Sequence, residues 1–533
     1  MSSHPSVAST PVVLPQPAVN PWLIAVVVSL AAFMEVLDTS IANVALPHIA
    51  GDLGASNDES TWVLTSYLVS NAIVLPISGW FVGMLGRKRF FMICIALFTA
   101  SSLLCGVAWS LGFLLLARVI QGAGGGGLQP MAQAILADSF PPEKRGLAFS
   151  VYGFTAIVAP SIGPTLGGWI TDNYSWRWIF YINLPVGLIA LYLVYKLIED
   201  PVYISRNVGR FLKVDYIGFG LLAVGVGALQ ILLDKGQEDD WFGSRFITSL
   251  AITALVCLVT LVIYEWFQRE PIVDVRLFTH ANFSIASLVM FMVGAISFAS
   301  TVLMPQYLQT LMGYTAETAG LVMSAAAVVL LFELPIVGQL TTRIQGRYMI
   351  AFGWLALCIG MYYSTKRIDL LISMSSATRL RILQYAPLGF IFIPATTAAY
   401  IGVAADKNNA VAGLINFVRN IGSSVGTSLV TTIIARRSQY HQGVLAEHSS
   451  IVNQNFQAAV QGTAQQLARA GLSTFGAQQQ ALARLYAEVR IQAAALAYID
   501  TYWVLAVAAL IMFGLSFLLQ KNRPGDKPAV PMH

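Results

Sequence analysis

The chain has 533 residues, of which 56% are hydrophobic and only 11% are charged, and its formal net charge is +5. Soluble globular domains contain about 25% charged residues, so this composition leaves too few charges to cover a water-exposed surface. The basic residues are scattered along the chain rather than clustered, which excludes a nucleic-acid-binding face. The composition therefore predicts an all-α polytopic membrane protein.

The N-terminal segment 1–21 is rich in Pro and Ser and has no Lys or Arg, unlike a secretory signal peptide, so we expect a disordered cytoplasmic tail. Apolar stretches of roughly 20 residues, the length that crosses a bilayer, then follow one another along most of the chain. We predict fourteen spans, beginning near Trp22, Thr61, Phe90, Gly112, Leu147, Ile179, Tyr216, Phe246, Phe283, Thr318, Tyr348, Ile382, Val411 and Ile499.

The loops between these spans carry an uneven charge that predicts their orientation. Lys and Arg gather in alternate loops, which predicts that both termini lie in the cytoplasm. One loop disagrees with this assignment. It would lie on the extracytoplasmic side, and yet it holds four basic residues, Lys366, Arg367, Arg379 and Arg381.

A loose internal repeat divides the chain. The pattern at 79–87 (GWFVGMLGR) returns at 338–347 (GQLTTRIQGR), an offset of about 260 residues, as expected for a transporter built from two similar halves. We predict a six-helix bundle at 22–198, a linker with two inserted helices at 199–270, a second six-helix bundle at 271–520 and a cytoplasmic tail at 521–533. The second bundle includes an extracytoplasmic segment, 436–498.

Glu35 and Asp38 in the first span and Arg118 in the fourth are ionisable residues within hydrocarbon, where they are functional candidates by default. The two acids are three residues apart, so they share a helical face, and close carboxylates in an apolar cavity resist ionising together. The helical rise places Asp38 and Arg118 at similar depth. Proton coupling is the favoured interpretation, and a structural ion pair between helices is the alternative.

Glu333 in the tenth span and Arg419 in the thirteenth also match in depth, and we expect them to form a second buried charge pair with a structural role. The glycine-rich run 122–127 (GAGGGG) lies inside an apolar span, so close helix packing is favoured over nucleotide binding. The chain has no Walker A motif, which predicts an ion gradient as the energy source, and we expect no bound cofactor.

Two further segments have predicted roles. The fifth span contains Pro160, Gly163, Pro164, Gly167 and Gly168, a composition that lets a helix bend and pack closely in a moving bundle, with a static kink as the alternative. Segment 436–498 is rich in Ala and Gln and has an amphipathic helical pattern at Leu482, Leu485, Val489 and Ala493. It is either a flexible loop that rests on the bundle or a surface that docks a partner.

Five stretches, taken in order, resemble motifs of the major facilitator superfamily. They are 37–47 (LDTSIANVALP), 79–89 with Gly79, Gly86 and Arg87, 118–122 (RVIQG), 159–168 (APSIGPTLGG) and 176–185 (WRWIFYINLP). The likeness covers nearly the whole chain and is strongest to the fourteen-span drug:proton antiporters of the EmrB type. In the 79–89 motif, Gly83 stands where the family commonly has an aspartate.

The resemblance implies a major facilitator fold and export of hydrophobic or amphiphilic compounds in exchange for protons, with Asp38 and Arg118 linked to coupling. It also implies a periplasmic adaptor of the membrane-fusion type and an outer-membrane channel as partners. An importer or uniporter on the same fold is the first alternative. An intramembrane enzyme would need a nucleophile–base or metal constellation, and we identify none in the predicted spans.

Overall fold

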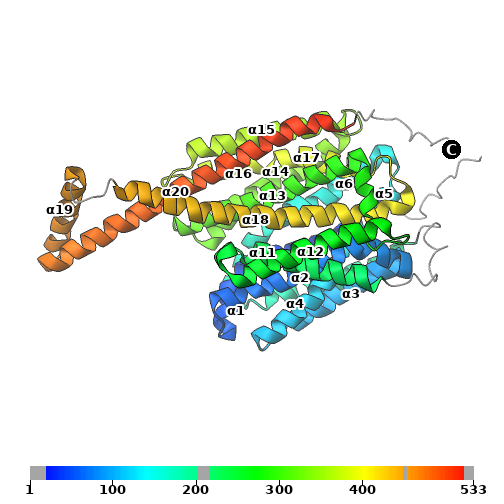
Figure 1. The fold of residues 1–533 in the computed structure, drawn as a ribbon, viewed down its shortest axis with the longest axis horizontal. Coiled ribbons are helices and arrows are strands. Elements are labelled where there is room, and N and C mark those ends of the chain that lie inside the picture. Colours follow the sequence, from blue (N-terminus) through cyan, green and yellow to red (C-terminus); the bar gives the residue numbers. More distant parts are fainter. Residues whose placement is uncertain (1–19, 201–214, 448–452, 521–533) are drawn as a thin grey trace, which may run out of the picture.

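The computed structural model describes residues 20–200, 215–447 and 453–520, and all regular secondary structure in these ranges is helical (Figure 1). The first half comprises α1 (Pro21–Leu53), α2 (Asn57–Leu85), α3 (Arg87–Gly106), α4 (Leu111–Gly125), α5 (Leu128–Ser139), α6 (Arg145–Gly153), α7 (Ala159–Asn173), α8 (Trp178–Tyr181) and α9 (Asn183–Leu197). The predicted tail 521–533 and most of the predicted tail 1–21 lie outside the described residues.

The inserted pair consists of α11 (Tyr216–Lys235) and α12 (Arg245–Phe267). The second half comprises α13 (Ala281–Thr310), α14 (Ala316–Leu340), α15 (Gly346–Arg367), α16 (Met374–Tyr385), α17 (Pro387–Ala399), α18 (Asn408–Glu447), α19 (Gln454–Arg469) and α20 (Thr474–Leu515). Short helical turns lie at η1 (Pro142–Lys144), η2 (Phe154–Val158), η3 (Trp241–Gly243), η4 (Val275–Thr279), η5 (Ala405–Lys407) and η6 (Ser516–Leu518).

Thirteen helical segments in the described ranges are long and apolar enough to cross a membrane, and they match thirteen of the predicted spans. The remaining predicted span, near Val411, falls on α18, which packs along α13, α20 and α2 inside the bundle. This helix is more polar than the others because one of its faces carries Asn416, Arg419 and Asn420. The total of fourteen spans stays a prediction, and α18 is the helix on which it depends.

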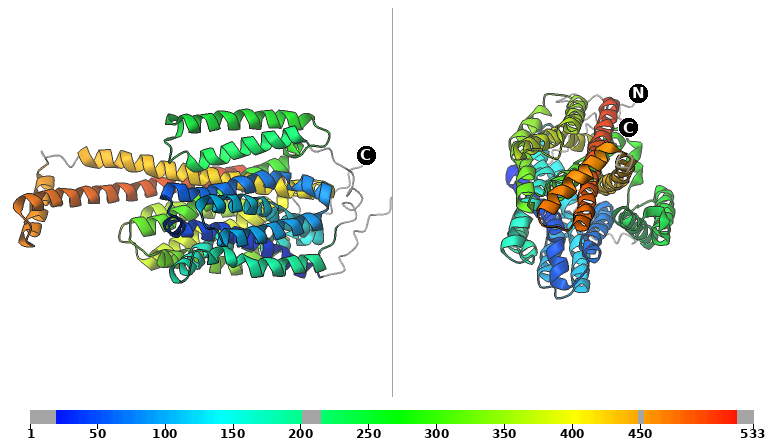
Figure 2. Two further views of the ribbon diagram at one scale, coloured as in Figure 1. Left: turned by 90° about the horizontal axis from the view of Figure 1, so that it is seen from below. Right: turned by 90° about the vertical axis from the view of Figure 1, so that its left-hand side faces the viewer.

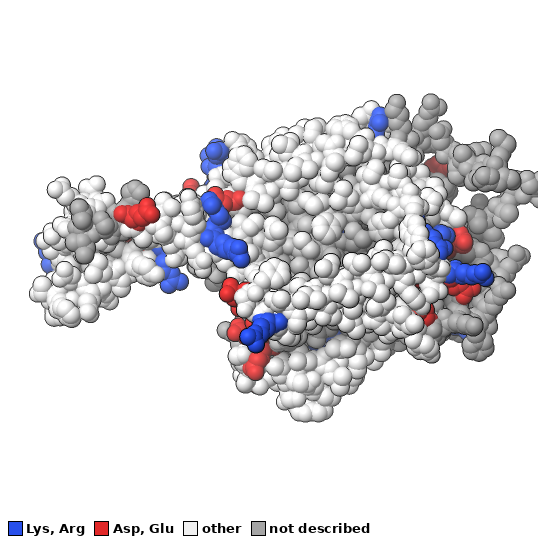
Figure 3. All heavy atoms as spheres, viewed as in Figure 1, with Lys and Arg blue, Asp and Glu red and all other residues white. Residues whose placement is uncertain are grey.

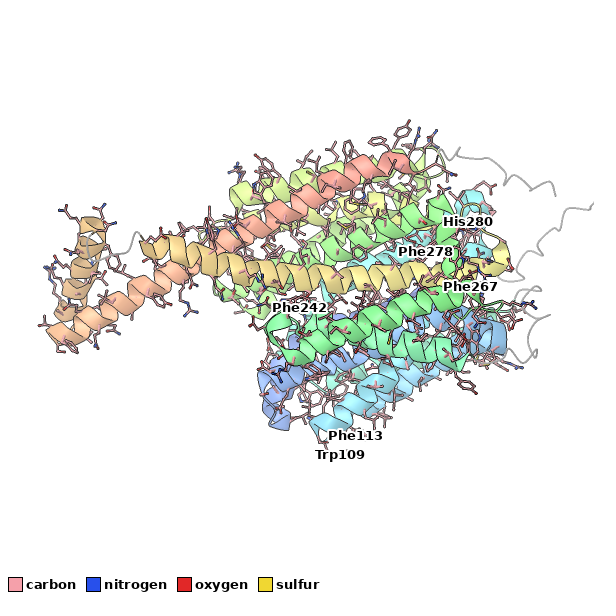
Figure 4. All side chains as sticks on the ribbon, in the orientation of Figure 1. Trp109, Phe113, Phe242, Phe267, Phe278 and His280 are labelled. Atoms are coloured by element: carbon pink, nitrogen blue, oxygen red, sulfur yellow. The ribbon has the colours of Figure 1, made fainter. Side chains whose placement is uncertain are left out.

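The outer surface of the bundle has the character of a lipid-facing surface. Figure 3 shows charged side chains at the two ends of the bundle and an almost uncharged band between them on the face in view. Exposed aromatic side chains also lie near the ends, with Trp109 and Phe242 at one end and Phe267 and Phe278 at the other (Figure 4). Aromatic rings are enriched at both membrane–water boundaries, so this distribution agrees with a spanning bundle.

Helices α18 and α20 have 40 and 42 residues, which corresponds to about 60 Å each against a hydrocarbon core of about 30 Å. They therefore extend beyond the bundle and, with α19, form an arm that projects from one end of the molecule (Figures 1 and 2). The arm corresponds to the predicted segment 436–498. Its amphipathic stretch is continuous with the last span, because no Gly or Pro occurs between Gly476 and Gly514 to end α20.

Helices α13 and α18 approach each other through glycines. A β-carbon built on Gly422 would lie 2.1 Å from the carbonyl oxygen of Phe291, and one built on Gly426 would lie 2.2 Å from that of Ala295. Neither backbone oxygen can move without shifting its whole helix. Small residues at such crossings allow the van der Waals contact that holds membrane helices together.

We expect Gly422→Ala to lower the thermal unfolding midpoint of the purified protein clearly, because overpacking typically costs about 1–3 kcal/mol and here backbone opposes the new methyl group. Gly443→Ala is the matched control on the same helix, since a β-carbon there has nothing within 4 Å. Thermal unfolding monitored by intrinsic fluorescence would compare the two variants. Equal midpoints would contradict the close packing of α13 and α18.

Candidate functional site

Asp38 on α1 and Arg118 on α4 form an ion pair inside the first bundle. Arg118 Nη1 lies 2.6 Å from Asp38 Oδ2, and neither side chain is more than 1% exposed. The second oxygen of Asp38 accepts hydrogen bonds from Gln121 Nε2 at 3.0 Å and from Asn183 Nδ2 at 2.6 Å. The guanidinium also lies 4.3 Å from the centroid of the Tyr67 ring. The structure thus brings these two predicted residues together.

Glu35 lies one turn away on α1, is equally buried, and belongs to a separate group of hydrogen bonds. Its Oε1 accepts from the hydroxyl of Tyr67 at 3.0 Å and from Asn71 Nδ2 at 3.1 Å. Its Oε2 accepts from Gln129 Nε2 at 2.6 Å. The two acids share a helical face as expected, but each carboxylate is held by its own donors.

The group around Glu35 continues into the second half through α18. Arg419 Nη2 donates to Gln129 Oε1, and the hydroxyl of Tyr152 lies 3.0 Å from the same oxygen. One turn further along, Asn416 Nδ2 donates to Gln133 Oε1 at 2.9 Å. The polar face of α18 is therefore its contact with the first bundle, which accounts for the polar composition of this helix.

The predicted pair between Glu333 and Arg419 is not formed. Arg419 bonds to the first half, whereas Glu333 lies on α14 beside Gly389, and its buried Oε1 has no hydrogen-bond partner. No ion pair found within the described ranges includes Glu333. Equal depth did not bring the two side chains together, because α14 packs mainly on α7, α6 and α16, away from the polar face of α18.

Arg381 is a functional candidate that the sequence analysis missed, because it was counted among the basic residues of a loop. The prediction that it lies outside the membrane is wrong, because it lies within α16 and is fully buried. Its Nη1 donates to Ser300 Oγ at 3.0 Å and its Nη2 to Thr301 Oγ1 at 3.1 Å. No carboxylate in the described residues pairs with it.

The internal repeat is the signal that could have found Arg381. At the offset of about 260 residues, Arg381 corresponds to Arg118 and Ser300 to Asp38, as expected for repeated halves. The amides repeat as well: Gln384 Nε2 donates to Ser364 Oγ at 2.8 Å, as Gln121 Nε2 donates to Ser102 Oγ at 2.7 Å. The second half therefore repeats the site of the first half but lacks its acid.

The residues of the motif at 79–89 join the two halves at the predicted cytoplasmic end. A β-carbon on Gly79 would lie 3.1 Å from the backbone of Ala410, and Gly86 adopts a φ of 83° at the turn into α3. Arg87 Nη1 lies 2.5 Å from Asp138 Oδ2, and its Nε donates to Asn409 Oδ1 at 3.1 Å. Asp138 on α5 therefore pairs with the arginine of this motif.

The predicted fifth span contains a break in its α-helical pattern and packs closely on α1, as its composition indicates. A π-helical turn, η2, separates α6 from α7 and ends just before Pro160, whose carbonyl accepts from Ser40 Oγ at 3.0 Å. A β-carbon built on Gly163 would lie 2.2 Å from Ser40 Oγ, and one built on Gly167 would lie 3.0 Å from Ile41 Cγ2. Pro164 lies inside α7, and Gly168 is buried.

Helix α7 also contacts the second half at the opposite end from Arg87. Thr165 Oγ1 lies 2.7 Å from Ser324 Oγ of α14, and a β-carbon on Gly320 would lie 2.9 Å from Thr165 Cα. The same helix therefore touches α1, which carries both acids, and α14 of the other half. This arrangement can transmit a change at Asp38 to the contact between the halves.

Comparisons with known proteins agree with this geometry. The family model that matches is that of the Major Facilitator Superfamily, and it covers residues 28–427. The multidrug export protein EmrB of Haemophilus influenzae is 41% identical over 431 residues, 81% of this chain and 84% of that protein. The EmrB protein of Escherichia coli is 35% identical over 493 residues, 92% of this chain and 94% of that protein.

Solved structures show the same fold. The proton:xylose symporter XylE aligns with a TM-score of 0.60 at 14% identity, covering 94% of this chain and 96% of that chain. Together with the thirteen apolar helices, the bacterial relatives show a multi-pass protein of the bacterial inner membrane, a transporter and not an enzyme. The chain belongs to the Major Facilitator Superfamily, and within it to the EmrB-type proteins.

Proposed function

We propose that the chain exports hydrophobic or amphiphilic toxic compounds from the cytoplasm in exchange for protons. The similarity to EmrB multidrug export proteins over most of the chain supports multidrug efflux. The observation that carries proton coupling is the pair of acids, Glu35 and Asp38, buried on one helix at the centre of a membrane-embedded bundle. Ionisable groups are costly there and are retained at ion pathways and proton relays.

In this proposal the two halves rock about the central contacts. Protons from outside load Glu35 and Asp38, and their release to the cytoplasm resets the cycle. Opening toward the cytoplasm separates Arg87 and Asp138 of the first half from their partners on α18, Asn409 and Asn408. Opening outward breaks the contact of Thr165 with Ser324. The inserted pair α11–α12 stays at the side of the bundle.

The test is transport by the purified full chain in proteoliposomes under an imposed pH gradient. We expect an amphiphilic fluorescent dye to move against the direction of proton movement, and the movement to stop when an ionophore collapses the gradient. Dye that moves in the same direction as protons, or without regard to the gradient, would instead establish an importer or a uniporter on this fold.

We further propose that the arm docks a periplasmic adaptor of the membrane-fusion type, which connects the chain to an outer-membrane channel. The arm projects as helices rather than lying on the bundle (Figure 2). A hollow of about 550 Å³ opens between α18, α19 and α20, and Leu482, Leu485 and Val489 line it. An apolar groove between helices accepts the apolar face of a partner helix.

We expect Leu485→Asp to abolish co-purification with a co-expressed adaptor and to leave dye exchange in proteoliposomes unchanged, because a charge in the hollow opposes an apolar partner. Gln480→Asp, an exposed position on the same helix, is the matched control and should retain the adaptor. If both variants retained the adaptor, the proposal that the arm docks the adaptor would be contradicted.

A further inference from the structure

Gln129 lies between a carboxylate of one half and a guanidinium of the other. Its Nε2 donates to Glu35 Oε2 at 2.6 Å, and its Oε1 accepts from Arg419 Nη2 of α18. Gln129 itself is 7% exposed and Glu35 is 3% exposed, so water competes little for these bonds. The amide is thus the link through which an acid on α1 contacts a cation on α18.

The two ends of an amide are not equivalent. The oxygen only accepts hydrogen bonds and the nitrogen only donates them, an ionised carboxylate only accepts, and a guanidinium only donates. With Glu35 ionised, a single orientation of Gln129 satisfies both neighbours, with the nitrogen toward Glu35 and the oxygen toward Arg419. This is the orientation in the structure.

A proton on Glu35 Oε2 reverses this requirement. The new hydroxyl must donate, and Glu35 Oε1 is already held by donors from Tyr67 and Asn71, so the acceptor within reach is the oxygen of Gln129. The amide must turn over to present that oxygen, and its nitrogen then faces Arg419. Two donors cannot bond to each other, so the contact between Gln129 and Arg419 is lost.

We infer that Gln129 is a positioning residue whose side-chain amide converts the protonation of Glu35 into the release of Arg419, and so loosens α18 from the first half. This inference rests on the proposed function only in that Glu35 takes up a proton. It assigns to Gln129 a role in transmitting protonation between the two halves, without itself gaining or losing a proton.

The other charged and titratable groups near Glu35 do not supply this link. From the elements packed around it, they are Asp38 of α1, Tyr67 of α2, Arg118 of α4, Tyr152 of α6 and Arg419 of α18. Asp38 and Arg118 form an ion pair with each other. Tyr67 bonds to the oxygen of Glu35 that faces away from Gln129, and Tyr152 contacts Glu35 only through Gln129.

Gln133 provides a matched control on the same helix. It is fully buried, and its Oε1 accepts from Asn416 Nδ2 at 2.9 Å, so it too joins α5 to α18. It bonds to no acid in the described structure, and its partner Asn416 is neutral. Removing either amide therefore deletes one bond between the halves, but only Gln129 connects that bond to a group that takes up a proton.

The experiment measures distances between the halves by spin labelling and pulsed electron resonance, in full-length protein in lipid nanodiscs without substrate. Cytoplasmic labels replace Arg89 and Arg343, and extracytoplasmic labels replace Ser175 and Gln309, all of them exposed, in a chain with its native cysteines replaced by alanine. The variants are Gln129→Met, Gln133→Met and Glu35→Gln, recorded across a series from mildly alkaline to acidic pH.

We expect acid to shift the distance distribution of the parent chain and of Gln133→Met, and we expect Gln129→Met to lose that shift. Glu35→Gln should hold, at every pH, the distribution that the parent reaches only in acid. If Gln129→Met does not fold, Arg419→Met removes the other end of the same bond and should likewise lose the acid shift. A normal acid shift in Gln129→Met, or its loss in both glutamine variants, would overturn the inference. Because no substrate is present, failure of drug export would leave this result standing.

Discussion

Asp38→Asn is expected to reduce drug-dependent proton movement in proteoliposomes to the level of liposomes without protein, and export against a gradient with it. Asparagine has the size of aspartate, and its oxygen can still accept hydrogen bonds from Gln121 and Asn183. Its amide nitrogen then faces the Arg118 donor, so we expect the variant to lose stability as well, and transport is compared at matched amounts of protein in the membrane. Asparagine cannot bind and release a proton at neutral pH, and it leaves Arg118 without a counter-charge. Proton movement is followed with a pH-sensitive dye after addition of drug.

Asp52→Asn is the matched control for this variant. Asp52 lies on the same helix and pairs with Arg177 at 2.5 Å, but it is 48% exposed. Exposed ion pairs contribute about 0–1 kcal/mol, so we expect near-normal transport and stability from the control. Undiminished proton-coupled export by Asp38→Asn, with the protein present in the membrane at normal amount, would refute the coupling role of Asp38.

Arg118→Met is expected to destabilise the protein strongly, whereas Arg381→Met should change its stability little. Both arginines are fully buried, but Arg118 neutralises Asp38 and Arg381 bonds only to neutral groups. Removing one member of a buried ion pair costs about 3–5 kcal/mol, because the other charge stays buried without a partner. Removing a buried cation that has no counter-charge leaves no such penalty.

Thermal unfolding midpoints of the two variants in the same detergent would measure this difference. The double variant Asp38→Asn/Arg118→Met should regain most of the lost stability, since neither charge remains, but it should not regain export. Equal destabilisation by Arg118→Met and Arg381→Met would contradict the ion-pair argument. Recovery of export in the double variant would show instead that the pair is only structural.

Most of the fold could be predicted from the sequence. Each helix that crosses the hydrocarbon core needs a long apolar stretch, and each such stretch can be recognised separately in the sequence. The span predicted near Val411 is the exception: it corresponds to α18, whose polar face bonds largely to residues of the first half and which is less apolar than the other thirteen helices. The arm was predicted as an extracytoplasmic segment with one amphipathic pattern. Its continuity with the last span depends on the absence of helix-ending residues over a long stretch.

The site was predictable where two charges of opposite sign had to neutralise each other at one depth, as Asp38 and Arg118 do. The same argument failed for Glu333 and Arg419, because depth says nothing about the direction in which a side chain points. Gln129 and Gln133 were not identified, since a neutral amide in an apolar stretch has no charge to mark it. Their importance follows only from which helices the fold places beside α5.

The polar face of α18 has a consequence for how the chain is assembled in the membrane. An arginine at the centre of a helix costs about 2.5–3.5 kcal/mol on entry into the bilayer from the translocon. Gln129, which bonds to Arg419, and Gln133 and Tyr152, which bond to Asn416, are made more than two hundred residues earlier in synthesis. If α18 is the fourteenth span, as we predict, it enters a membrane that already contains its partners, and the first half is then the template on which the second half is completed.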